Sequence, residues 1–296
     1  VWHLDLDLQV VVGLMHELGL DDPRRSELLV VIEHALDALD LHDVPGTAGA
    51  GREWLRPILE TPAAASAQQT TLVGHAHIDT AWLWPRRETR RKCARTFSSA
   101  VTLMEGEYPE HRFACSQAAQ YQWIEDDHPE LFDRIRAQVA AGCFVPVGSM
   151  WVEADCNLPS GESLARQFVW DRRYFADRFG LESTPSNAVV WIPDVFGYAG
   201  NLPQIMRLAG CEFFLTQKLS WNQTNPFPHH SFWWEGIDGS RVFTHFTPVD
   251  TYNGEVTSHE LRRAERNFRD RGRATRTLYP FGHGDGGGGP TREMLE

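Results

Sequence analysis

The sequence has no C-x-x-C pair, and its five cysteines stand far apart at irregular spacing. An odd, unpatterned set in a chain of 296 residues argues against a disulfide framework and against a zinc knuckle. We therefore expect reduced thiols and a cytoplasmic protein. The cysteines are Cys93, Cys115, Cys143, Cys156 and Cys211.

Long apolar runs and basic residues are also scarce. No run approaches the roughly 18 apolar residues that a membrane-spanning helix needs, and Asp5 and Asp7 stand where a secretory signal would carry Lys or Arg. Lysine and arginine number 28 against 40 acidic residues, a net charge of -12. Because phosphate contacts need clustered basic side chains, we expect no membrane insertion and no nucleic-acid binding, and a neutral or cationic small substrate instead.

The remaining composition is that of a globular protein, with 42% hydrophobic and 11% aromatic residues. A chain of this length can bury a large domain and a smaller appendage. It starts at Val1, and residues 290–296 begin like a helix that stops within about two turns. We expect a fragment of a longer protein.

The first 69 residues are predicted to be a helical segment with a connector. Apolar residues recur at helical spacing between Leu8 and Leu41, and Asp22-Pro23 supplies an N-cap and a first-turn proline for a second helix. This pattern predicts an antiparallel helix pair. Residues 43–70 are rich in Gly, Pro, Ala, Ser and Gln, which predicts a connector with a short helix over 53–59.

Residues 70–296 alternate between short apolar runs and helical stretches. That alternation predicts an α/β domain with a parallel sheet covered on both faces, or a barrel, whose chemistry gathers at the carboxyl ends of the strands. The predicted strands are 71–73, 112–115, 144–147, 188–191, 213–216, 241–247 and 278–280, and the predicted helices are 88–105, 118–126, 129–141, 160–179, 201–209 and 258–268.

Three of these strand ends carry polar residues of catalytic type. His77 and Asp79 follow the first strand two residues apart, a spacing that turns an imidazole and a carboxylate to the same side. Asp194 follows a strand and Pro193, and His283 and Asp285 lie among six glycines. Taken singly, each has a structural alternative: a satisfied polar pair, a helix cap or a flexible linker. Together at three strand ends, they favour a shared site that includes half of a metal centre.

Tryptophan gathers beside these loops. Nine of the 11 tryptophans fall after residue 80. An acidic cleft edged with aromatic rings is suited to sugars, whose C–H faces stack on rings while their hydroxyls meet carboxylates. Core packing accounts for some of these tryptophans. The pattern therefore indicates carbohydrate as the substrate class, but it does not identify which tryptophan contacts the sugar.

Four segments, GHAHIDTAWLWP, WIPDVFGYAGNLPQIM, KLSWNQTNPFPHHSFWWEGIDGSRV and FGHGDGGGGPT, closely resemble the class II α-mannosidases of glycoside hydrolase family 38, in their cytosolic and vacuolar branch. The resemblance covers about residues 70–296. It implies a (β/α)7-type, barrel-like catalytic domain over 70–296, preceded by a small helical segment over 1–69. It also implies a retaining, zinc-dependent exo-α-mannosidase acting on mannose-containing oligosaccharides.

The resemblance also assigns residues. His77, Asp79 and Asp194 match the zinc ligands, with another divalent ion such as Co²⁺ as the alternative, and Asp194 also matches the nucleophile. Asp285 is the candidate acid/base, and Trp82 matches the ring under the sugar. Further candidate subsite residues are Trp151 (with the loop to Glu153), Asp155, Tyr252 and His283.

In the resembling family a further histidine completes the metal site, and its position lies beyond Glu296. We therefore expect the 296 residues alone to bind zinc weakly and to turn over poorly. Two other functions stay open: a metal-dependent sugar deacetylase or amidohydrolase, and a noncatalytic sugar-binding protein. A homo-oligomer of the full-length protein also stays open.

Overall fold

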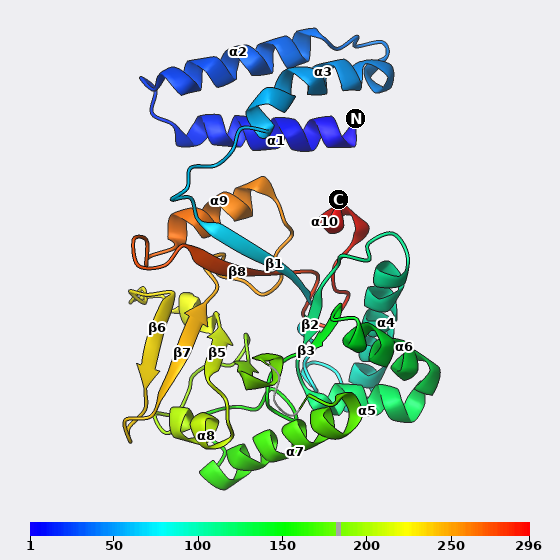
Figure 1. Ribbon diagram of the computed structural model, residues 1–296, viewed down its shortest axis with the longest axis vertical. Helices are drawn as coiled ribbons and strands as arrows, with labels where there is room; N and C mark the ends of the chain where they lie inside the picture. The colour runs from blue at the N-terminus through cyan, green and yellow to red at the C-terminus, as the bar shows by residue number, and fades with distance from the viewer. Residues whose placement is uncertain (182–184) are drawn as a thin grey trace. The chain divides into compact units, whose positions relative to one another are not determined.

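The computed structural model describes residues 1–181 and 185–296. The chain divides into two compact units (Figure 1). The smaller unit contains Val1–Ala67 and Thr257–Arg262, and the larger contains Gln68–Val256 and Arg263–Glu296.

The smaller unit is built on three helices, α1 (Trp2–Glu17), α2 (Pro23–Asp37) and α3 (Val44–Leu59), and α1 and α2 run antiparallel (Figure 1). The predicted start of α2 is confirmed, because Pro23 opens the helix and the Asp22 carboxylate accepts a hydrogen bond from the Arg24 amide at 2.9 Å. The three helices bury a common apolar cluster that includes Leu4, Val11, Leu28, Ile32 and Leu55.

The prediction of a connector over 43–70 is wrong for its first part, since α3 begins at Val44. Asp43 caps this helix by accepting a hydrogen bond from the Gly46 amide. Gly51, which the composition suggested was a loop residue, lies where α3 passes close to α2: a Cβ added there would stand 2.9 Å from the Ala35 carbonyl oxygen. The small residues of this segment therefore allow close helix packing.

The larger unit holds a four-stranded, all-parallel sheet in the order β3-β2-β1-β8. Helices α4 and α5–α6 connect β1 to β2 and β2 to β3, and they bury an aromatic cluster against the sheet that includes Phe97, Phe113, Tyr121 and Phe144. The elements are β1 (Gln69–His75), α4 (Arg86–Glu105), β2 (Phe113–Cys115), α5 (Ala118–Asp127), α6 (Pro129–Ala140), β3 (Phe144–Pro146) and β8 (Arg276–Phe281).

A second four-stranded sheet has the order β4-β5-β7-β6. Strands β4, β5 and β7 are parallel, whereas β6 runs antiparallel to β7. The sequence analysis did not predict β6. The elements of this half are α7 (Gly161–Phe179), η1 (Pro185–Ala188), β4 (Val189–Trp191), α8 (Leu202–Leu208), β5 (Phe213–Thr216), η2 (Lys218–Trp221), β6 (Ser231–Glu235), β7 (Arg241–Phe246) and, at the end of the chain, α10 (Arg292–Leu295). Helix α9 (Ser258–Asn267) begins in the smaller unit and ends in the larger one.

The two sheets share an apolar core. Ala114 and Val147 from the first half pack with Trp191 and Leu215 from the second. The predicted α/β class with parallel strands is confirmed. The described strands form two separate hydrogen-bonded sheets, so closure into a barrel stays a prediction. Within the described residues, no helix is both long enough and apolar enough to cross a membrane.

Candidate active site and metal centre

The first part of the site lies in the loop that follows β1. His77 and Asp79 come after the strand has ended at His75, and the His77 Nε2 atom lies 3.2 Å from Asp79 Oδ1. The carbonyl of the buried Ile78 between them accepts hydrogen bonds from the Gln117 and Gln120 side-chain amides, at 3.0 and 2.8 Å. The loop backbone is thus fixed, and both side chains are presented on the same side.

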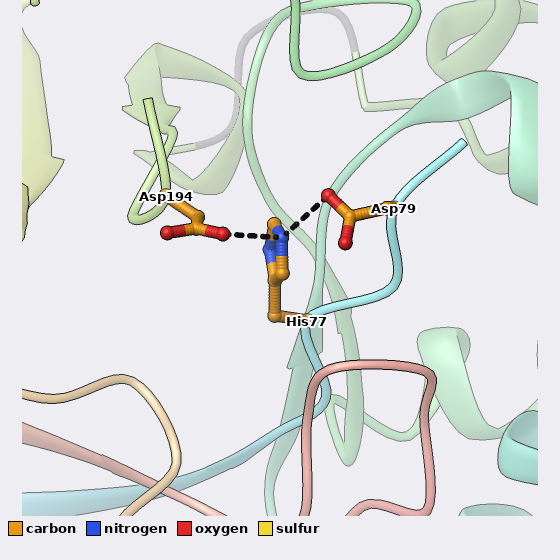
Figure 2. A group of neighbouring side chains, drawn as sticks. All are labelled: His77, Asp79 and Asp194. Atoms are coloured by element: carbon orange, nitrogen blue, oxygen red, sulfur yellow. Dashed lines mark hydrogen bonds and ion pairs between the residues drawn. The ribbon is translucent and has the colours of Figure 1, made fainter. Parts of the chain in front are cut away.

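Asp194 reaches the same point from the second sheet. It follows β4, and its Oδ2 atom lies 3.4 Å from His77 Nε2 (Figure 2). One nitrogen of His77 and one oxygen each from Asp79 and Asp194 lie within 4.8 Å of one another. An imidazole with two carboxylates is a donor set that suits Zn²⁺ and related divalent ions. The three residues therefore form a candidate metal site.

The electrostatics of this cluster favour a cation. His77 is 2% exposed, and its Nδ1 atom lies 3.3 Å from Glu153 Oε1. Burial disfavours the charged ring, but the negative charges of Glu153 and Asp79 outweigh it and raise the pKa of His77 to about 10. Three carboxylates around one buried ring give a surplus of negative charge, which a divalent cation at the Nε2 side would balance.

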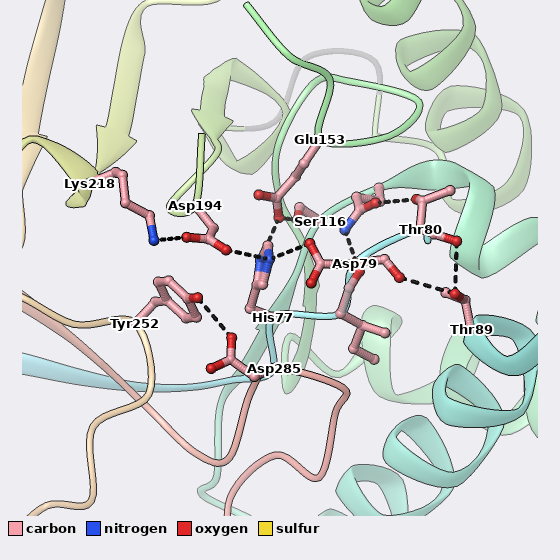
Figure 3. Close-up of polar contacts among 12 residues, drawn as sticks. His77, Asp79, Thr80, Thr89, Ser116, Glu153, Asp194, Lys218, Tyr252 and Asp285 are labelled. Carbon is pink, nitrogen blue, oxygen red and sulfur yellow. Dashed lines mark hydrogen bonds and ion pairs between the residues drawn. The ribbon is translucent and has the colours of Figure 1, made fainter. Parts of the chain in front are cut away.

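Lys218 is a site residue that the sequence analysis did not assign. It begins η2, two positions after β5 ends at Thr216, and its buried Nζ forms an ion pair with Asp194 Oδ1 (Figure 3). The same Nζ lies 3.4 Å from the centre of the Trp221 ring and 4.4 Å from that of Phe196. The lysine therefore contacts a carboxylate and two aromatic rings, both of which attract a cation.

Asp285 joins the cluster through Tyr252. The buried Tyr252 packs its ring 4.8 Å from that of His77, and its hydroxyl donates to Asp285 Oδ1 at 2.9 Å (Figure 3). Burial, with the charges of Asp194 and Asp285, raises the pKa of Tyr252, so the phenol keeps its proton and acts as a donor. Asp285 is exposed and has φ of 48°, in a loop where Gly286 to Gly289 also have positive φ.

The other predicted residues have different surroundings. Trp82 is 60% exposed and packs edge-on against Trp84. Trp151 packs edge-on against Tyr174, beside the apolar core.

Two predicted polar residues make local contacts. The Asp155 carboxylate accepts from the amides of Leu158 and Asn157, which lower its pKa. The exposed His283 pairs with Gly289 through backbone hydrogen bonds. Among the polar contacts of the described residues, none brings Trp151, Asp155 or His283 into the cluster.

Comparison with known proteins identifies the family. Residues 67–296 match the glycosyl hydrolases family 38 N-terminal domain. The chain belongs to glycosyl hydrolase family 38. It is 44% identical over 301 residues to Alpha-mannosidase 2C1 of Homo sapiens, covering 100% of this chain and 28% of that protein. It is 49% identical over 294 residues to Alpha-mannosidase G of Dictyostelium discoideum, covering 98% and 27%.

These family 38 relatives are much longer, because the chain spans only about a quarter of their length. The fold is also similar to the crystal structure of an alpha-mannosidase from Enterococcus faecalis, with a TM-score of 0.61 and 18% identity over 75% of this chain and 26% of that one. A 4-alpha-glucanotransferase from Thermococcus litoralis gives a TM-score of 0.53 and 15% identity over 74% and 34%. At such low identities, these two structures support the fold alone.

Proposed function

We propose that the protein is a retaining exo-α-mannosidase that hydrolyses terminal α-D-mannosyl residues of oligosaccharides. The observation that carries this proposal is the convergence of His77, Asp79 and Asp194 from two strand ends, with Asp285 joined to them through Tyr252. Membership of family 38 and relatives named as alpha-mannosidases support the same substrate class.

In the proposed reaction, Asp194 attacks the anomeric carbon while Asp285 donates a proton to the departing glycosidic oxygen. Water then attacks the glycosyl-enzyme, Asp285 takes its proton, and Asp194 leaves as a carboxylate, so the configuration is retained. Retaining glycosidases hold these carboxyl groups about 5–5.5 Å apart. The Tyr252 hydrogen bond to Asp285 would orient the acid/base, and the Lys218 ion pair would orient the nucleophile.

We further propose that His77, Asp79 and Asp194 hold Zn²⁺, with Co²⁺ as the alternative. When bound, the ion would supply Lewis-acid stabilisation and a chelating template for vicinal sugar hydroxyls. The exposed ring of Trp82 would form the platform for the sugar. Since the chain spans about a quarter of the length of its relatives, we propose that these 296 residues alone hydrolyse mannosides poorly.

At the level of the fold, we propose residues 70–296 as the catalytic domain and 1–69 as the helical N-terminal segment. Among the described residues, seven of the eight strands run parallel to a neighbouring strand and the two sheets share a core, which supports a (β/α)7-type barrel-like arrangement. The subsite roles of Trp151, Asp155 and His283, the cytoplasmic location and a homo-oligomer stay predictions.

The test is covalent trapping in the full-length protein. An activated fluoro-mannoside that forms a slowly hydrolysed glycosyl-enzyme should label Asp194, located by mass spectrometry of the peptides, and Asp194→Asn should abolish the label in protein that is still folded by circular dichroism. Labelling of another residue would refute the nucleophile. Turnover without any covalent intermediate would also refute Asp194 as the nucleophile and would indicate direct attack by a water that a carboxylate activates.

A further inference from the structure

A buried carboxylate lies on the side of His77 that faces away from the candidate metal position. Glu153 stands in the segment between β3 and α7, and its Oε1 atom lies 3.3 Å from His77 Nδ1. The two side chains are 7% and 2% exposed. Asp79 and Asp194 contact the opposite nitrogen, Nε2, so the ring lies between carboxylates on both sides (Figure 3).

Glu153 is held in place by the end of a neighbouring strand. Ser116 directly follows β2, and its hydroxyl donates to Glu153 Oε1 at 2.9 Å. The segment after β3 passes very close to this serine: Gly148 has φ of 83°, and a Cβ added there would lie 2.9 Å from Ser116 Cβ. A glycine at this close approach allows the segment that carries Glu153 to lie against β2.

The remaining contacts of Glu153 do not account for its burial. Its Oε2 atom and the facing His77 Nδ1 atom are both buried without a hydrogen bond among the described residues, so the 3.3 Å approach of Oε1 to Nδ1 is an ion-pair contact. Removing a carboxylate from water costs several kcal/mol unless charged or hydrogen-bonding partners compensate. The charged partner of Glu153 here is the His77 ring. We therefore explain the burial of Glu153 by its interaction with that ring.

We propose that Glu153 is a positioning residue that accepts the Nδ1 proton of His77 and so directs Nε2 toward a divalent cation shared with Asp79 and Asp194. Histidines that ligate metals usually donate their second ring N–H to a carboxylate, a carbonyl or water, which fixes the tautomer and makes the ligating nitrogen more basic. The inference rests on the metal site of the proposed function. It extends that site by a residue that does not itself touch the ion.

The experiment measures metal binding by the full-length protein rather than turnover. Zn²⁺ affinity is obtained by competition with a chromogenic chelator, and Co²⁺ coordination by visible absorption. Loss of a carboxylate behind a metal-ligating histidine typically weakens metal binding about 10- to 100-fold. We expect a loss of this size and an altered Co²⁺ spectrum for Glu153→Ala, and a smaller loss for Glu153→Gln, whose amide oxygen still accepts from Nδ1.

The matched control is Asp171→Asn. Asp171 is also a fully buried carboxylate with one oxygen unpaired, but its other oxygen accepts from the Ala118 amide and not from a cluster residue. This variant should keep wild-type Zn²⁺ affinity. The inference is overturned if Glu153→Ala binds Zn²⁺ as tightly as wild type. It is also overturned if Asp171→Asn loses as much Zn²⁺ affinity as Glu153→Ala. If wild-type protein binds neither Zn²⁺ nor Co²⁺, the metal site of the proposed function is refuted and this inference with it.

Discussion

Asp194 and Lys218 form an ion pair that is largely buried in the site. Their side chains are 16% and 4% exposed, so neither charge is well hydrated. Breaking a buried pair by removing one partner leaves the other charge uncompensated, whereas an exposed pair contributes little. The lysine is therefore expected to matter for stability as well as for the orientation of the nucleophile.

Replacing this lysine by an uncharged side chain of similar length tests the expectation. Lys218→Met should lower the free energy of unfolding by about 3 kcal/mol in metal-free buffer, because the Asp194 Oδ1 atom loses its charged partner and only Oδ2 still faces a basic group, His77. Lys218→Arg should recover part of that loss. The measurement is urea denaturation followed by tryptophan fluorescence.

Lys92→Met is the control, since the Lys92 Nζ also lies over a tryptophan ring, 4.3 Å from the centre of Trp84. No ion pair with a carboxylate accompanies that contact in the described part of the chain. Lys92→Met should therefore lower the free energy of unfolding only by the cation–π contribution, about 0.5–1 kcal/mol. Equal losses in the two methionine variants would show that the ion pair with Asp194 contributes nothing.

Residues that share a short motif could be predicted from the sequence, and residues that meet only in space could not. His77 and Asp79 are two positions apart, and Asp194 was visible because a carboxylate followed an apolar strand and Pro193. Lys218 is a lysine at the end of another strand, with no local pattern that separates it from a surface lysine. Its role depends on the β4 and β5 loops meeting, which no single sequence segment encodes.

At the scale of elements, the sequence pattern located most helices and strands of the larger unit but missed β6. Its residues 231–235 are mostly aromatic and lie inside one of the segments that resemble family 38. A signal was present, because Asp238-Gly239 between two apolar runs is a typical hairpin turn, and Gly239 has φ of 85°. In α3 the composition predicts a connector, whereas Gly51 lies within the helix and permits its close contact with α2.

The glycines of α3 provide a direct test of that explanation. Gly51→Ala places a methyl group 2.9 Å from the Ala35 carbonyl oxygen and 3.2 Å from Leu39, so it should destabilise the helical unit by about 1–3 kcal/mol. Gly49→Ala has nothing within 4 Å of the new Cβ and should stabilise the helix by up to about 1 kcal/mol. Thermal unfolding followed by circular dichroism compares the two. A stabilising Gly51→Ala would contradict the close packing of α3 on α2.

At the scale of the whole larger unit, two histidines form hydrogen bonds between the sheets, the fully buried His75 and the partly buried His245. His75 at the end of β1 donates from Nδ1 to the Ala114 carbonyl at 2.8 Å and accepts from Trp191 Nε1, on β4, at 3.5 Å. The Leu278 amide of β8 donates to His245 Nε2, on β7, at 3.2 Å. Each accepting nitrogen must be unprotonated, so both contacts between the two sheets require neutral rings.

Stability should therefore decrease in mild acid. Burial lowers the pKa of His75 from 6.5 to about 4, so between these values the unfolded chain binds a proton that the folded protein does not. The stability from this residue is fully present above pH 6.5 and is lost as the pH falls to about 4, up to about 3 kcal/mol. His75→Gln keeps a donor and an acceptor but does not titrate, so its unfolding free energy, measured in urea at each pH, should fall less steeply over this range. If the unfolding free energies of wild type and His75→Gln fall in parallel with pH, the contact between the sheets does not depend on a neutral His75.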